Sequence, residues 1–353
     1  MWPDRRILEL FGIELPILQA PMASSTFAEM AIAVSEAGGL GALPMALLGP
    51  DQARAELATL RAGTTRPVNL NFFCHTPPAE DPARDAAWRA KLLPYYRELG
   101  VDPAASVPAA NRAPFDAAMC ALVEEARPAV VSFHFGLPAP DLRARVRATG
   151  AAIIASATSV DEARWLEAQG CDAIIAQGAE AGGHRGCFLG DPVTVAATQA
   201  GTMALVPQVV DAVRVPVIAA GGIADARGIV AAFALGAAAV QLGTAYLFCP
   251  EARLPPSHRA ALQGAKDSST ALTNLFSGRP ARGIVNRAMR ELGPLSPDAP
   301  AFPLAGHALA PLKALADADF GSLWSGQTAA LGRAMPAGEL TRTLARETLA
   351  RLR

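Results

Sequence analysis

The chain has few cysteines, and they are not spaced as metal ligands. Its five cysteines are scattered among 353 residues, and no Cys-x-x-Cys pair occurs. This usage is typical of a protein kept reduced in the cytoplasm, where disulfides are rare. The spacing gives no reason to expect zinc or iron–sulfur ligation, so we predict no metal site.

The chain also has almost no net charge and no long apolar run. The formal net charge is only −1, which argues against nucleic acid or an anionic membrane surface as a partner. No apolar run is long and uninterrupted enough to span a bilayer, and the first residues lead into no secretory segment. We therefore predict a cytoplasmic protein without a membrane partner.

Short apolar runs alternate with helical segments through most of the chain. The eight predicted strands are residues 17–22, 40–45, 66–74, 129–135, 151–156, 173–177, 216–220 and 239–242. Continuous apolar runs of this kind are typical of parallel strands buried on both faces. Eight such units in about 250 residues favour a closed (β/α)8 TIM barrel. An open doubly wound sheet is the alternative, but no Gly-x-Gly-x-x-Gly opens the first helix after a strand.

Two segments interrupt this rhythm. Residues 75–107 are rich in proline, alanine and charge and contain an amphipathic helix at 85–99, and residues 250–325 are irregular. We predict that 75–107 and 250–325 form a smaller, mostly helical substrate or lid lobe. The barrel then consists of 1–74 and 108–249, completed by the C-terminal segment 326–353.

Two local patterns predict particular helix features. Thr26 and Glu29 have the spacing of a capping box ahead of a helix at 27–37. The last helix, 339–352, is basic and amphipathic, so we expect it to pack on the outside of the barrel with its arginines in solvent.

The loop at 177–186 (QGAEAGGHRG) follows a predicted strand and surrounds one histidine with four glycines. Glycines let the backbone approach a ligand closely. His184 carries the side chain whose ordinary pKa lies nearest neutrality, which suits a general base. The alternative is that His184 only caps a turn.

Small residues also follow the last two strands. Gly221 and Gly222 follow the seventh strand, and residues 241–244 (QLGT) end the eighth. In barrels this is a common phosphate site. Together with the amide side chains of Asn71 and Gln177 and the absence of a dinucleotide motif, it predicts FMN as the cofactor, with Met22 against the flat ring.

Seven motifs resemble those of the nitronate monooxygenases, formerly called 2-nitropropane dioxygenases. They are residues 19–22 (QAPM), 71–78 (NFFCHTPP), 131–136 (VSFHFG), 177–186, 219–223 (AAGGI), 241–244 and 277–282 (SGRPAR). The resemblance runs from about residue 10 to about residue 330, and the second and third motifs look specific to the class I branch. The His184 loop alone is shared with flavin-dependent enoyl-acyl-carrier-protein reductases.

The resemblance implies roles for individual residues. His184 is the expected catalytic residue. From their places at strand ends, and not from the resemblance, His75 and His134 are expected to line the substrate pocket; the alternative for each is a hydrogen-bonded core histidine. The expected FMN-binding residues are Ala20, Pro21, Met22, Ala23, Asn71, Gln177, Gly182, Gly183, Gly221, Gly222, Gln241, Leu242, Gly243 and Thr244. Ala23 and Ser24 stand where many relatives have two glycines.

The activity implied by the resemblance is the oxidation of alkyl nitronates, such as propionate 3-nitronate, by O2 to a carbonyl compound and nitrite. The expected partners are thus a small nitronate or nitroalkane and O2, and the protein is either a monomer or a homodimer. The alternatives are an NAD(P)H-dependent FMN reductase acting on an enoyl thioester or a quinone, and a non-redox barrel that binds a substrate phosphate.

Overall fold

Eight parallel strands form one sheet in residues 1–104 and 112–353, the part of the chain that this computed structural model describes. They are β1 (Ile17–Gln19), β2 (Gly41–Pro44), β3 (Val68–Phe73), β4 (Val130–His134), β5 (Ala152–Ala157), β6 (Ala173–Gln177), β8 (Val217–Ala220) and β9 (Ala239–Leu242). Their order is β1-β9-β8-β6-β5-β4-β3-β2, and a parallel bridge between Leu18 and Leu40 brings the two ends together. The sheet is therefore a nearly closed barrel, which confirms the predicted (β/α)8 fold over the open sheet.

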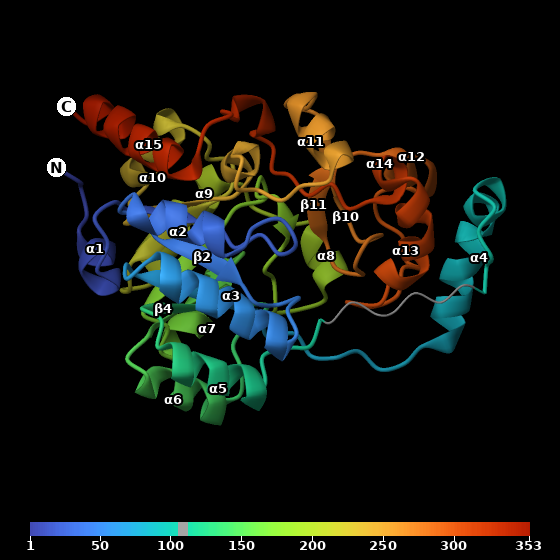
Figure 1. The fold of residues 1–353 in the computed structure, drawn as a ribbon, viewed down its shortest axis with the longest axis horizontal. Helices are drawn as coiled ribbons and strands as arrows, with labels where there is room; N and C mark the ends of the chain where they lie inside the picture. Colours follow the sequence, from blue (N-terminus) through green and yellow to red (C-terminus); the bar gives the residue numbers. More distant parts are fainter. Residues whose placement is uncertain (105–111) are drawn as a thin grey trace.

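Helices surround the barrel, as Figure 1 shows. They are α2 (Ala28–Glu36), α3 (Pro50–Gly63), α5 (Ala117–Ala126), α6 (Pro140–Ala148), α7 (Val160–Ala168), α9 (Thr202–Ala212), α10 (Ala226–Ala234) and α15 (Ala337–Arg351). In β5, Ala152 and Ile154 belong to the cluster inside the barrel, whereas Ile153 and Ala155 belong to the larger cluster that includes the helices. Both faces of the strand are thus buried, which explains why its sequence is apolar throughout.

The amino-terminal end of the barrel is covered by a helix that the sequence pattern did not predict. This helix is α1 (Arg6–Phe11), and its Ile7 and Phe11 join the interior cluster at the first residues of several strands. On the outside, α15 packs against α2 and α10, as predicted for the C-terminal helix. Arg342 and Arg346 of α15 are exposed.

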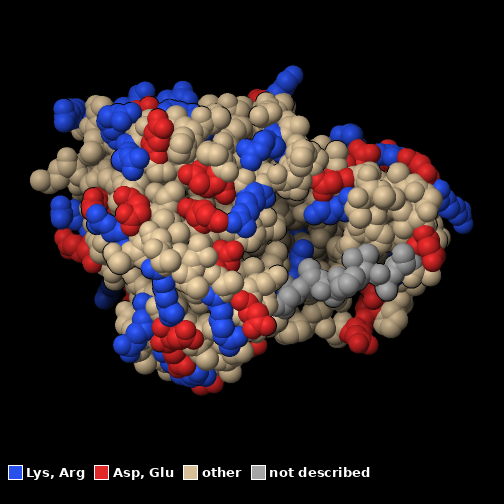
Figure 2. Space-filling view, viewed as in Figure 1, with Lys and Arg blue, Asp and Glu red and all other residues tan. Residues whose placement is uncertain are grey.

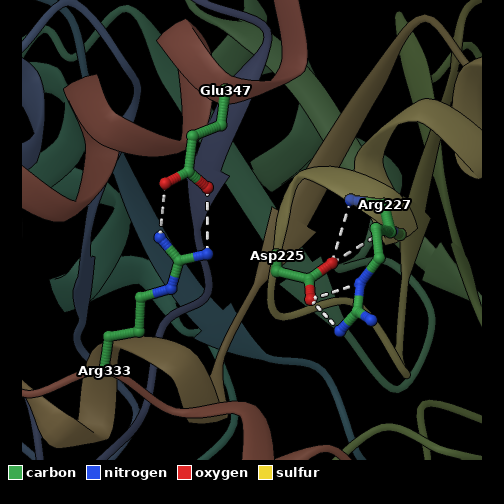
Figure 3. A network of polar contacts seen from close by, with 5 residues as sticks. Asp225, Arg227, Arg333 and Glu347 are labelled. Atoms are coloured by element: carbon green, nitrogen blue, oxygen red, sulfur yellow. Dashed lines mark hydrogen bonds and ion pairs between the residues drawn. The ribbon is translucent and has the colours of Figure 1, made fainter. Parts of the chain in front are cut away.

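One side-chain carboxylate caps the start of α10, and another ties α15 to the segment before it. Asp225 is the N-cap of α10 and accepts hydrogen bonds from the backbone N–H groups of Arg227 (2.9 Å) and Gly228 (3.4 Å). Arg333 donates to both oxygens of Glu347 in α15 at 2.8 and 2.9 Å. Figure 3 shows the two pairs on neighbouring segments.

A second hydrophobic cluster lies outside the barrel. Trp88 and Tyr96 of α4 (Pro82–Glu98) pack there with Met289, Leu312 and Phe320. The other elements of this region are α11 (Pro256–Gln263), β10 (Thr270–Thr273), β11 (Ala281–Ile284), α12 (Arg287–Leu292), α13 (Gly306–Leu315) and α14 (Asp317–Phe320). Figure 1 shows the group beside the barrel, on the side opposite α1, and Figure 2 shows the surface hollowed between the two. We call this group the lobe; the predicted division of the chain into barrel and lobe stays a prediction, and its boundary at 107/108 lies outside the described residues.

The lobe also contains a small antiparallel sheet that its irregular sequence did not predict. Its order is β10-β11-β7, where β7 (Gly183–His184) comes from the loop after β6. The remaining short elements are α8 (Pro192–Ala196), η1 (Thr244–Phe248) and η2 (Ala329–Leu331). In the described part of the chain, no helix is both long and apolar enough to cross a membrane.

The predicted capping box at the start of α2 is wrong. The N-cap is Phe27, and the N–H of Ala28 donates instead to a carboxylate oxygen of Glu56 in α3 (2.9 Å). The Thr26 hydroxyl is buried and bonds to the backbone of Met22, at 3.3 Å from the nitrogen and 3.2 Å from the oxygen. It closes the turn after β1, so it is not free to cap the helix.

Candidate active site

The loop that carries His184 is held by the lobe as well as by the barrel. His184 and Gly183 pair with Ala281 and Arg282 of β11. Gly183 has φ +70°, and a Cβ at Gly182 would lie 2.4 Å from the backbone nitrogen of Gly326. The loop therefore needs glycine at 182 in order to pass the neighbouring backbone, and it favours glycine at 183 because of the positive φ.

Polar side chains from the barrel fix the carbonyl of His184. Gln177 donates from Nε2 to this oxygen (3.0 Å), and its Oε1 accepts the N–H of Gly186 (2.8 Å). Nε2 of His134 lies 3.2 Å from the same oxygen. Arg185, only 1% exposed, donates to the carbonyls of Gln177 (2.7 Å) and Gly178 (2.5 Å). These hydrogen bonds fix the backbone conformation of the loop around His184.

The imidazole of His184 is half-buried among aromatic rings. The rings whose centroids lie between 5.3 and 6.1 Å from it are those of Phe73, Phe135, Phe302 and Trp324. Phe73 ends β3 and Phe135 follows β4, whereas the last two belong to the C-terminal part of the chain. His184 therefore lies at the junction of barrel and lobe, where water is largely displaced by hydrocarbon.

Two arginines lie in the same neighbourhood without a carboxylate partner among the described residues. The Cζ of Arg279 is 4.3 Å from the centroid of Phe135, and that of Arg112 is 5.9 Å from the centroid of Phe302. Burial, followed by the charges of Arg112, His134, Arg279 and His75, lowers the pKa of His184 well below its ordinary value. The imidazole is consequently neutral at pH 7.

The two other histidines predicted for the pocket lie close by. Burial, with Arg279 and Arg112, lowers the pKa of His75 to about 4, and its Nδ1 is buried without a partner in the described chain. Burial likewise lowers the pKa of His134 to about 4. Both ring nitrogens of His134 are engaged, since Nδ1 lies 3.1 Å from Ser156 Oγ. His134 thus has the contacts of the hydrogen-bonded histidine that the sequence left open, and a pocket role for either histidine stays a prediction.

The residues predicted to bind the cofactor all lie at the carboxyl ends of the barrel strands. Ala20, Pro21, Met22 and Ala23 follow β1, Asn71 is in β3, Gln177 ends β6, Gly182 and Gly183 lie in the loop after β6, Gly221 and Gly222 follow β8, and Gln241, Leu242, Gly243 and Thr244 end β9 or follow it. A Cβ at Gly243 would lie 3.5 Å from Ala20 Cβ and 3.6 Å from Met22 Sδ. The predicted cofactor-binding residues at the ends of β1 and β9 therefore lie next to one another.

The backbone and hydrogen bonds of this region bear on what the residues can hold. Gly221 and Gly222 have φ +107° and +71°, which gives the turn after β8 a backbone surface without side chains. The Oε1 of Gln241 is buried and has no partner among the described residues. Asn71 donates from Nδ2 to Ser132 Oγ (2.9 Å), and the Thr244 hydroxyl accepts the N–H of Gly326 (2.8 Å).

Similarity to known proteins extends over nearly the whole chain. A family model described as "Nitronate monooxygenase" matches residues 4–347. The chain belongs to the nitronate monooxygenase family. Nitronate monooxygenase of Paraburkholderia phytofirmans is 44% identical over 350 residues, which cover 97% of this chain and 94% of that protein. This result confirms the resemblance seen in the motifs and makes the protein an oxidoreductase.

Solved structures of similar proteins agree with this assignment. The crystal structure of nitroalkane oxidase from Streptomyces ansochromogenes has a TM-score of 0.88 and 38% identity, covering 98% of each chain. FabK from Thermotoga maritima is more distant, with a TM-score of 0.73, 28% identity and coverage of 100% and 98%. The nitronate monooxygenase fold therefore extends over both barrel and lobe.

Besides Phe73 and Phe135, whose motifs the resemblance included, sequence reasoning assigned no role to three further residues that lie against His184. Phe302 and Trp324 lie against its ring, and the Oγ of Ser277 is 2.9 Å from its Nε2. Phe302 and Trp324 stand in irregular sequence that gives no signal. Ser277 opens the motif at 277–282, so the resemblance pointed to the segment without assigning the residue a role.

Proposed function

We propose that this nitronate monooxygenase family member uses FMN and oxidises alkyl nitronates with O2 to a carbonyl compound and nitrite. The observation that carries the proposal is the neutral imidazole of His184 beside Arg112 and Arg279, which have no carboxylate partner among the described residues. An anionic nitronate supplies the missing negative charge, and the surrounding rings accept its hydrocarbon part.

The residues at the strand ends fit FMN. The bare backbone at Gly221 and Gly222 can approach a phosphate, and the unpartnered Oε1 of Gln241 can accept a hydrogen bond from a ring N–H. Met22 supplies a thioether for an aromatic surface. When bound, FMN accepts electrons from the substrate and passes them to O2.

The protein's own part is to bind the substrate, exclude water and handle one proton. A nitronate has already lost its α-proton, so the site needs only to hold it, and the guanidinium groups provide the charge. For a neutral nitroalkane, the unprotonated imidazole of His184 is a competent base. Propionate 3-nitronate suits the site because its carboxylate is a second partner for the two arginines.

Spectroscopy of the purified protein tests the cofactor and the reaction together. We expect a yellow protein whose visible absorption bleaches when propionate 3-nitronate is added without oxygen, and recovers in air with release of nitrite. A colourless protein that cannot take up FMN contradicts the proposal. Rapid anaerobic bleaching by NADPH but not by the nitronate supports the FMN reductase alternative instead.

Substitution of His184 tests the base. In His184→Asn, turnover of a neutral nitroalkane should fall by about 10²- to 10⁴-fold, the usual contribution of a general base, while nitronate oxidation falls much less. His307→Asn, which changes a histidine of the lobe helix α13, serves as the matched control. Equal losses on both substrates remove the base assignment.

A further inference from the structure

Ser277 gives His184 a hydrogen-bond partner whose geometry determines where the imidazole proton lies. The side chain of Ser277 is fully buried (0% exposed) in the turn before β11. Its Oγ lies 2.9 Å from His184 Nε2, 3.3 Å from the carbonyl oxygen of Arg279 and 3.4 Å from the nitrogen of Arg279. One hydroxyl therefore faces three polar atoms.

The hydrogen-bonding capacity of a hydroxyl selects between two arrangements. A serine hydroxyl has one hydrogen to donate and can accept two hydrogen bonds. If it donates to the carbonyl of Arg279, it can accept from the Arg279 N–H and from a protonated Nε2 of His184, and all three contacts are hydrogen bonds. If it donates to Nε2 instead, the carbonyl loses this partner. Because the group is buried, the arrangement that satisfies all three contacts is favoured.

We propose that Ser277 is a positioning residue that fixes neutral His184 as the Nε2–H tautomer, which leaves Nδ1 as the proton-accepting atom. Nδ1 has no hydrogen-bond partner among the residues that the structure describes. The backbone around the ring is held by Gln177, by His134 and by pairing with β11. The ring therefore keeps one nitrogen against Ser277 and the other available.

The proton step rests on the proposed function, whereas the tautomer does not. The Cα–H bond of a neutral nitroalkane breaks, its electron pair stays on the substrate, which becomes the nitronate, and the proton forms an N–H bond at Nδ1. The Nε2–H bond to Ser277 Oγ persists through this transfer and becomes charge-assisted in the imidazolium. Ser277 thus stabilises the protonated base without having to rotate.

Nitrogen NMR on the purified holoprotein tests the tautomer directly. The chain has only five histidines, so their ring nitrogens can be separated in a long-range ¹H–¹⁵N spectrum, with His184 assigned by comparison with His184→Asn. At pH 7 we expect Nε2 to carry the proton and Nδ1 to be bare. A resting His184 protonated on Nδ1 overturns the proposal, whether or not the protein oxidises any nitronate.

Substitution of Ser277 adds a readout that a purely structural role would not move. In Ser277→Ala we expect mixed tautomers, about a tenfold lower kcat/KM for a neutral nitroalkane, and an acidic limb of the pH profile displaced to lower pH, because the imidazolium has lost an acceptor. Ser277→Thr keeps the hydroxyl and should restore the tautomer and the profile. An unchanged tautomer and acidic limb in Ser277→Ala contradict the proposal, as does a Thr variant that resembles Ala.

Discussion

At the scale of single residues, we expect the two arginines beside His184 to determine which anions the site prefers. Arg112 lies against the ring of Phe302 and makes no ion pair within the described chain. In Arg112→Gln we expect KM for propionate 3-nitronate to rise by roughly 10- to 100-fold, since a hydrogen bond to a charged group contributes about 1.5–3 kcal/mol. Steady-state kinetics with nitrite detection measures the change.

The control for Arg112 is a nitronate without a carboxylate. For the nitronate of nitroethane, KM should rise less, because only one negative charge loses a partner. Arg351→Gln, at the end of α15 on the outside of the barrel, should change neither constant. The same increase in KM for both nitronates would show that Arg112 does not discriminate between them.

Ser24 has a backbone conformation that its side chain disfavours. Its φ is +67° and the residue is exposed in the turn after β1. In Ser24→Gly, relief of the left-handed strain exceeds the entropy cost of glycine in the unfolded chain, so we expect a gain of about 0.5–1 kcal/mol in the free energy of unfolding. Urea denaturation measures it, and Ser25→Gly, without a positive φ to relieve, should lose stability. A loss in both variants would contradict the account.

At the scale of elements, the start of α10 depends on one carboxylate. Asp225 accepts hydrogen bonds from two of the first N–H groups of this helix, and its other oxygen also accepts two from the exposed guanidinium of Arg227 (Figure 3). Asp225→Ala should lower the free energy of unfolding by about 1 kcal/mol, the usual cost of losing an N-cap. Arg227→Ala removes only an exposed ion pair and should cost less than about 0.5 kcal/mol. Equal losses would assign the stabilisation to the ion pair.

The barrel strands were predictable because each is buried on both faces and so carries a continuous apolar signal. All eight appear, and β6 and β9 have the predicted bounds. Apart from helix α1, the features that the sequence did not predict are contacts between distant segments. The pairing of His184 with Ala281 and the capping of α2 by Glu56 depend on tertiary packing that no local pattern encodes.

In the candidate site, too, the positions at strand ends were predictable and the contacts between distant segments were not. Strand ends converge at one end of a parallel barrel, so His184 and His134 could be placed together from their positions alone. Phe302 and Trp324 could not, since they reach His184 only after the lobe has folded. The hydrogen-bond partners of Gln177 and His134 were likewise visible only in the folded loop.

At the scale of the whole molecule, stability should depend on pH through the histidines. Burial is the first cause of a lowered pKa for all five, and the pKa values of His75 and His134 fall to about 4 from an ordinary 6.5. Below pH 6.5 the unfolded chain takes up protons at His75 and His134, whereas the folded chain does not until about pH 4. The stability is therefore complete above pH 6.5 and is lost as the pH falls toward 4.

Urea denaturation at pH 8, 7, 6 and 5 measures this dependence. His75 and His134 should each contribute a slope approaching about 1.4 kcal/mol per pH unit between pH 6 and 5, with little change between pH 8 and 7. In His75→Gln the slope of the unfolding free energy against pH should fall by up to about 1.4 kcal/mol per pH unit, because one fewer proton is taken up on unfolding. This change in slope is expected even if the variant is less stable at every pH. A free energy of unfolding that stays constant or rises from pH 7 to 5 would mean that the histidines around the site are protonated in the folded protein. In that case His184 could hold an anion but could not accept a proton.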